Sequence, residues 1–213
     1  AAYVNAGNAC KGRTFVLGSD LTLGSDWTGI GNNTTNPFGG TLNGNGHTIT
    51  YDDAKTPLFG TVSGRVSDIA VAGSGKINGG IADTLLGGTI ENCRVRSGSS
   101  FVGDDIAGGI VGTISTANAS IPGGTVSGCT IEDGVSITGG SYVGGIAGRV
   151  IGQDDKGSAT ISNCEVGAAA IKGTGCTTNP ANGGGVGGMG GILGYGAGNI
   201  SDCMSDALIE ASK

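Results

Sequence analysis

Apolar and polar residues alternate at a spacing of two through several short stretches of the chain. Residues 93–95 read Cys-Arg-Val, and the same order of small apolar, polar and apolar side chains returns at 129–131 and 164–166. A period of two places one set of side chains on each face of a β-strand. These stretches are therefore predicted to be short strands with one buried face.

Turn-forming residues bound the predicted strands. Gly, Ser, Asn and Asp recur between the alternating stretches and favour tight turns. Apolar spacing of three and four, which would indicate helices, is almost absent. The last nine residues, 205–213 (SDALIEASK), are the one modest helix candidate. The pattern thus predicts an all-β protein.

A Gly-Gly-Ile-x-Gly motif recurs along the chain. Its copies begin at Gly108, Gly144 and Gly190, at spacings of 36 and 46 residues, and a degenerate copy occupies 78–83. The repeat positions are Gly108, Gly109, Ile110, Gly112, Gly144, Gly145, Ile146, Gly148, Gly190, Gly191, Ile192 and Gly194. A repeat of 20–50 residues is typical of a solenoid or an array.

A second motif alternates with the first and has the form Thr-Ile-x-Asn-Cys-x-Val. Its cysteines are Cys93, Cys129, Cys164 and Cys203, spaced 36, 35 and 39 residues apart. An earlier copy at 65–71 has Ile69 in place of the cysteine. A unit of about 36 residues therefore recurs about five times.

Short strands repeated at one period predict a parallel β-helix, in which each turn of the chain adds one strand to each sheet. Glycine would let the backbone turn with positive φ and let neighbouring turns approach closely, while the following Ile would fill the interior. A propeller is the alternative, but it favours about four strands per repeat and more aromatic packing. We predict one domain over residues 1–213, with opening turns at 1–71 and repeats at 72–213.

Composition narrows the functional classes. The chain has 47 glycines in 213 residues, 13% charged residues and a net charge of −6. Only 11 Lys and Arg are present and they form no run, so nucleic acid is an unfavoured partner. No apolar run approaches the ~20 residues of a membrane span. No signal peptide is recognised, and the absence of an initial Met leaves secretion open.

The repeats resemble the GLUG repeats of bacterial surface proteins. The resemblance rests on GGIVG, GGIAG and GGILG, on the TIxNCxV segments, and on NPFGGTLNGNGHTIT (36–50) with TPLFGTVSGRVSDIAV (56–71). It implies a right-handed parallel β-helix in a secreted or cell-surface protein. Such repeats occur in adhesins and in non-catalytic regions of immunoglobulin A peptidases, and they carry no catalytic residue to transfer.

The cysteines are predicted to form an inward row of small apolar side chains, because the same position accepts Ile69. A ladder of disulfides is the alternative, although parallel Cβ directions on neighbouring strands disfavour it. Cys10 and Cys176 lie outside the row; they are free, paired with a nearer cysteine, or at an interface between molecules. The ~36-residue spacing and the single histidine argue against a metal site, and no cofactor is expected.

Three acidic pairs and two single residues are the other candidates for chemistry. The pairs at 52–53, 104–105 and 154–155 are expected in solvated turns, with a structural calcium as the alternative. His47, the only histidine, is expected to fix a turn, and Trp27 to pack on the first turn of the chain. No residue is assigned to catalysis.

Three functional interpretations follow. The first is a non-catalytic extracellular adhesive module, a rigid rod whose loops, such as 173–185, bind a host or neighbouring-cell surface protein or glycan. The second is a filament subunit whose partners are copies of itself. The third is a polysaccharide-cleaving enzyme, disfavoured by few aromatic residues, 4% of the chain, and no convergent acid–base set.

Overall fold

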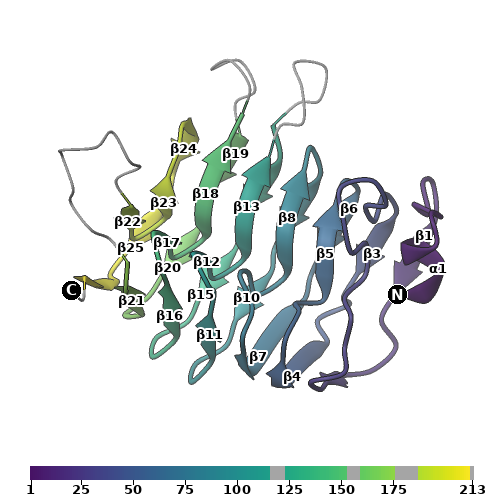
Figure 1. The fold of residues 1–213 in the computed structure, drawn as a ribbon, viewed down its shortest axis with the longest axis horizontal. Helices are drawn as coiled ribbons and strands as arrows, with labels where there is room; N and C mark the ends of the chain where they lie inside the picture. Colours follow the sequence, from purple (N-terminus) through teal and green to yellow (C-terminus); the bar gives the residue numbers. More distant parts are fainter. Residues whose placement is uncertain (116–122, 153–158, 176–186, 212–213) are drawn as a thin grey trace.

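The protein is an all-β molecule built from parallel sheets, as the alternation predicts. The computed structural model describes residues 1–115, 123–152, 159–175 and 187–211. In this part of the chain the only helix is the short α1 (Ala2–Asn5), which lies at the N-terminal end of the stack (Figure 1). Strands follow one another from the N-terminal end to the C-terminal end, and every described strand pair is parallel.

The described strands form four sheets. A seven-stranded sheet contains β1 (Thr14–Val16), β3 (Thr41–Asn43), β6 (Arg65–Ser67), β9 (Thr89–Glu91), β14 (Thr125–Ser127), β19 (Ala159–Ser162) and β24 (Gly198–Ser201). A five-stranded sheet contains β5 (Phe59–Val62), β8 (Ala82–Leu86), β13 (Val111–Ser115), β18 (Ala147–Ile151) and β23 (Leu193–Tyr195). A three-stranded sheet contains β12 (Ile106–Gly108), β17 (Tyr142–Gly144) and β22 (Gly188–Gly190).

The fourth sheet has eleven strands and combines two strands from most turns of the chain. Its members are β2 (Leu21–Leu23), β4 (Thr48–Ala54), β7 (Ala70–Gly75), β10 (Arg94–Val95), β11 (Ser100–Val102), β15 (Thr130–Ile131), β16 (Ser136–Gly139), β20 (Glu165–Val166), β21 (Ala170–Gly173), β25 (Met204–Ser205) and β26 (Leu208–Ala211).

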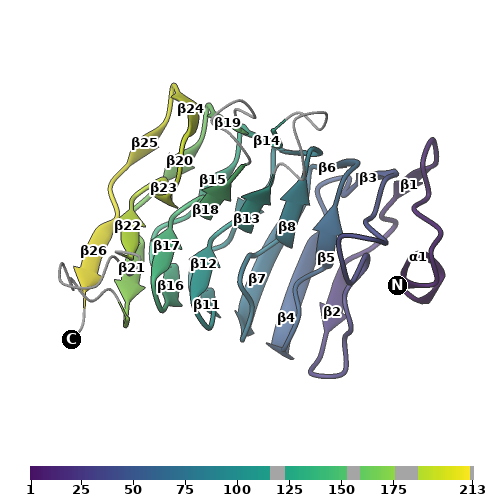
Figure 2. The same cartoon turned by 45° about the horizontal axis from the view of Figure 1, so that its top comes forward.

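Strand register follows the sequence repeat. Val126 lies opposite Ile90 on one side and Ile161 on the other, so residues about one repeat apart become neighbours. The same holds on the eleven-stranded sheet, where Phe101 lies opposite Ile137. Figure 2 shows the resulting layers side by side from β2 to β26. This pairing is consistent with a parallel β-helix.

The interior is filled by aligned rows of aliphatic side chains. Ile90, Val126 and Ile161 are at most 1% exposed and belong to one continuous apolar cluster. Aromatic residues enter the interior mainly in the first turns, where the ring centroids of Phe38 and Phe59 lie 4.9 Å apart. Three of the four cysteines of the second motif, Cys93, Cys129 and Cys164, lie in this cluster.

The glycines of the Gly-Gly-Ile motif are needed for close approach rather than for a left-handed backbone. None of them has a positive φ, so the prediction of positive-φ turns at these positions was wrong. A Cβ at Gly108 would lie 2.0 Å from the carbonyl oxygen of Val111, within the same turn. A Cβ at Gly109 would lie 2.3 Å from the carbonyl oxygen of Gly145, in the next turn. Only glycine fits at such distances.

Positive φ occurs instead at one position of the second motif. The residue before the cysteine is left-handed in each copy, at Asp68, Asn92, Gly128, Asn163 and Asp202, with φ between 52° and 61°. Asn and Asp tolerate this region better than other residues with a side chain. The sharp turn carries the chain from the seven-stranded sheet to the eleven-stranded sheet.

The C-terminal helix candidate was wrong. Residues 208–211 form β26, in which Ile209 lies opposite Ile171 and Glu210 opposite Lys172. The side chains of Lys172 and Glu210 make an exposed ion pair at 3.3 Å. Tertiary pairing therefore overrides the weak local helix preference. No helix among the described residues has the length and apolar character needed to cross a membrane.

Candidate functional site

The four motif cysteines occupy equivalent positions on successive turns. The residue that follows each cysteine begins a short strand, and these residues pair in register from one turn to the next: Arg94 with Thr130, Thr130 with Glu165, and Glu165 with Met204. Cys93, Cys129 and Cys164 are at most 2% exposed, and Cys203 on the last turn is partly exposed. All five described cysteines are free thiols; Cys176 lies outside the described residues.

The four motif thiols each make the same type of local hydrogen bond. Each Sγ donates to the carbonyl oxygen two residues earlier, at 3.3 Å in Cys93 and Cys164, 3.4 Å in Cys129 and 3.2 Å in Cys203. The left-handed residue between them makes this contact possible. Cysteine here therefore fills a narrow interior and satisfies a turn carbonyl.

The thiols also interact with one another along the row. Hydrogen bonding to the Cys164 and Cys93 thiols, with burial, raises the pKa of Cys129 well above its ordinary value. The Cys129 thiol in turn lowers the pKa of Cys164 to about 7. The backbone N–H of Cys164 donates to Sγ of Cys203 at 3.4 Å. The buried position of Cys164 keeps this acidified thiol from solvent.

His47 is held by a carboxylate from the preceding turn. Its Nδ1 lies 3.0 Å from Oδ1 of Asp20, and the same oxygen accepts the backbone N–H of Thr48 at 2.9 Å. The hydrogen bond from Thr48 is the main cause that lowers the pKa of the exposed Asp20. The described contacts of His47 include no Ser or Cys hydroxyl or thiol that it could activate.

The two described acidic pairs lie apart, and Asp53, Asp104 and Asp105 have local partners. Lys55 contacts Asp53 at 2.8 Å, Lys76 contacts Asp104 at 2.8 Å, and Asp105 accepts the backbone N–H of Ser141. The pair at 154–155 lies outside the described residues. Within the described ranges, no group of three or more His, Cys, Asp or Glu side chains could hold a metal ion.

Trp27 packs against the core from the first turns. Its indole Nε1 donates to the carbonyl oxygen of Pro57 at 2.9 Å, and Thr56 donates to the carbonyl oxygen of Trp27 at 2.6 Å. Cys10 is 8% exposed in the same N-terminal region.

Two further polar groups, the buried Tyr51 hydroxyl and the half-buried Asp83 carboxyl, were not singled out by the sequence. The Tyr51 hydroxyl donates to the carbonyl oxygen of Gly80 at 2.7 Å and accepts the N–H of Leu58 at 2.8 Å. Asp83 stands where the complete repeats have a glycine, and burial raises the pKa of its carboxyl to about 6. The replacement of the repeat glycine by an acidic residue in the degenerate copy at 78–83 was the sequence signal that could have identified Asp83.

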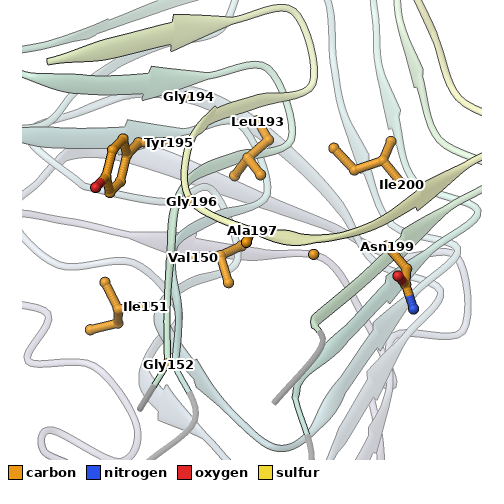
Figure 3. A pocket seen from close by; sticks show the side chains of 11 residues that line it. Val150, Ile151, Gly152, Leu193, Gly194, Tyr195, Gly196, Ala197, Asn199 and Ile200 are labelled. Carbon is orange, nitrogen blue, oxygen red and sulfur yellow. The ribbon is translucent and has the colours of Figure 1, made fainter. Parts of the chain in front are cut away.

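A groove at the C-terminal end has a volume of about 1070 Å³. Figure 3 shows Leu193 and Val150 near its centre, with Tyr195 and Ile151 on one side and Asn199 and Ile200 on the other. Most of the wall is aliphatic or glycine backbone. Nothing in this lining provides a paired acid and base.

A second groove is polar. We name it the Arg–Asn groove, after the polar side chains that line it: Asn43, Asn45, Asp68, Asn92, Arg94 and Arg96. It has a volume of about 540 Å³ and crosses three turns of the chain, at the passage from the seven-stranded to the eleven-stranded sheet. Of the candidate sites, this one brings the most hydrogen-bonding side chains together.

The fold places the chain in the all-β class with parallel sheets. The structure of this chain is similar to the crystal structure of a putative immunoglobulin A1 protease from Bacteroides ovatus, with a TM-score of 0.67 and 20% sequence identity between the two chains. The match covers 93% of this chain and 60% of that one. At this identity the likeness shows the fold alone. No family model matches the chain, and no curated protein matches it.

Proposed function

We propose that the chain is a non-catalytic extracellular module with a right-handed parallel β-helical fold of the GLUG-repeat type, which presents a binding surface as part of a bacterial surface protein. The observation that carries this proposal is the in-register pairing of equivalent residues on successive turns, as at Ile90, Val126 and Ile161. Such stacking makes a stiff, elongated scaffold whose outer side chains vary freely.

The similarity to the putative immunoglobulin A1 protease supports an extracellular setting, since this chain would match a part of a longer protein of that kind. The distribution of polar groups supports a binding role. Among the described residues, His47, the carboxylates of Asp53, Asp104 and Asp105, and the four motif cysteines lie in separate places, and each has a structural partner.

The test is retention of the purified chain on epithelial cells or immobilised mucin, with cleavage of immunoglobulin A1 and of an acidic polysaccharide measured in parallel. Saturable retention without turnover is the expected result. Deletion of residues 173–185, mostly outside the described ranges, asks whether that loop contributes. Turnover of either substrate by the pure chain would overturn the proposal.

Self-assembly is a second candidate, favoured by the exposure of interior-type residues on the last turn. Ile161 is 1% exposed, but its successor Ile200 is 47% exposed; Ile171 is 0% exposed, but Ile209 is 44% exposed. At the other end Phe15, opposite Leu42, is 42% exposed. A second copy stacked head to tail would cover both surfaces.

Sedimentation velocity and negative-stain electron microscopy across a concentration series test this second candidate. Filaments that disappear in an Ile200→Asp variant would support it. Isolated short rods at every concentration would exclude it and leave the adhesive module.

A further inference from the structure

The Arg–Asn groove is formed by a small side chain and by residues with a left-handed backbone, at equivalent positions on three neighbouring turns. Ala70, 4% exposed, lies between Thr48 and Arg94 in register, so a small side chain forms the floor between two larger ones. The left-handed turns at Asn45, Asp68 and Asn92 place three short polar side chains along one wall. The hollow is therefore set by the register of the turns.

Two guanidinium groups project over this floor. Arg94 lies on β10, and the backbone N–H of Arg96 donates to the carbonyl oxygen of Val71 at 2.8 Å, which continues the parallel pairing. Residues two apart on a strand point to the same face. Both arginines are exposed, and the described residues give neither guanidinium a hydrogen bond or an ion pair.

The nearby carboxylates are held by other donors. Glu91 forms an ion pair with Arg65, and Glu132 accepts the backbone N–H of Ser97 at 2.9 Å. Asp20 accepts the N–H of Thr48 and contacts His47, and the Arg96 charge makes only a smaller electrostatic contribution to its lowered pKa. Asp68 is the one carboxylate among the polar side chains that line the groove. Arg94 and Arg96 thus keep their donors for a ligand.

The combination of groups selects a chemical class. Guanidinium groups bind carboxylates through paired N–H donors. Asparagine amides both donate and accept, and a carboxylate accepts from hydroxyl groups. A sugar acid offers one carboxylate and several hydroxyls, which matches two Arg, three Asn and one Asp. A polyphosphate would place several negative charges beside Asp68, whereas a sugar acid places one carboxylate at the arginines and neutral hydroxyls beside Asp68.

We propose that the Arg–Asn groove binds a carboxylate-bearing saccharide residue, a uronic or sialic acid within a glycan. Arg94 and Arg96 bind the sugar carboxylate. Asn43, Asn45 and Asn92 contact ring hydroxyls, and Asp68 accepts from one of them. The inference rests on the proposed binding function and names the chemistry of its ligand.

The test titrates trigalacturonate and sialyllactose into the isotope-labelled chain and follows the Arg Nε–H and Asn side-chain amide signals by NMR. Methyl-esterified trigalacturonate and lactose are the neutral controls. Saturable shifts of the groove signals with an acid, and none with its neutral control, are expected. The acid that saturates identifies the source of the carboxylate as a uronate or a sialate.

Arg94→Gln and Arg96→Gln should each weaken binding by about tenfold or more, because each removes a charged donor. Lys172→Gln is the matched control, since it removes one positive charge from the same sheet and should leave binding unchanged. All three residues are exposed, so the fold should tolerate the changes; circular dichroism checks this.

Equal responses to acid and neutral probes, shifts outside the groove, or no saturation by either acid would overturn the inference. These outcomes are separate from a failure of the adhesive proposal, which is judged by retention on cells or mucin. A chain that binds a soluble sugar acid but is not retained would keep the groove and reject the adhesive role.

Discussion

The paired glycines that open each Gly-Gly-Ile motif lie too close to neighbouring atoms for a side chain, as Gly145 illustrates. A Cβ at Gly145 would lie 2.1 Å from the carbonyl oxygen of Gly191 in the next turn and 2.8 Å from the Val166 side chain. We expect Gly145→Ala to lower the free energy of unfolding by about 1–3 kcal/mol, because the turns must separate. Gly18→Ala is the control, since Gly18 has no atom within 4 Å of that position and no positive φ. Thermal unfolding measures both, and equal midpoints would contradict the close-approach argument.

Asp83 gives the fold a pH-dependent weakness. Burial raises its folded-state pKa from 3.8 to about 6, although the N–H of Asn78 acts in the opposite direction. A raised acid pKa means that the carboxylate form is disfavoured in the folded state. Ionisation of Asp83 therefore lowers the free energy of unfolding. This loss is absent below about pH 4, grows as the pH rises toward 6, and is complete at pH 7, where it is on the order of 2–3 kcal/mol.

Asp83→Asn should therefore stabilise the protein at pH 7 and leave its stability near pH 4 almost unchanged. The difference in unfolding free energy between variant and parent, measured by denaturant titration from pH 4 to 7, isolates this carboxyl from all other groups. Asp52→Asn, at an exposed site on β4, is the control. A flat difference across this range would show that Asp83 is not the source.

At the scale of elements, the turn before each cysteine depends on its left-handed residue. Asn163 has φ 52°, and Gly128 fills the equivalent position of the previous turn with φ 61°. Asn163→Ala should cost about 1 kcal/mol, because a Cβ without a local hydrogen bond disfavours this backbone. Asn163→Gly should cost little. Denaturant midpoints decide the order, and an alanine variant as stable as the glycine one would refute it.

Period and alternation were sufficient to predict parallel sheets, because register follows directly from a fixed repeat. They were insufficient at residues 208–211, where pairing with β21 outweighs a helix-like local pattern. The cysteine row was visible in the sequence because one spacing of about 36 relates its members. The Arg–Asn groove was not visible, since Asn43 and Arg96 become neighbours only through the register of three turns.

At the scale of the whole molecule, a stack of turns is stabilised by its neighbours and is weakest where one neighbour is missing. Inner strands such as β13 pair on both sides, with β8 and β18. The strands β24 and β26 pair on one side only within the described part of the chain, and all their residues are exposed. Stability in such arrays is a sum of units and interfaces.

Amide hydrogen exchange should therefore be slowest in β13 and fastest in β24 and β26, because local opening at an end breaks fewer contacts. Mass spectrometry of exchanged peptides measures this gradient, and uniform protection along the stack would contradict it. Repeating the measurement at increasing concentration separates two cases. Protection that rises in β24 and in the N-terminal β1 together indicates copies stacked head to tail. A gradient independent of concentration leaves the chain as a single rod, whose function depends on its outer surface and on the Arg–Asn groove.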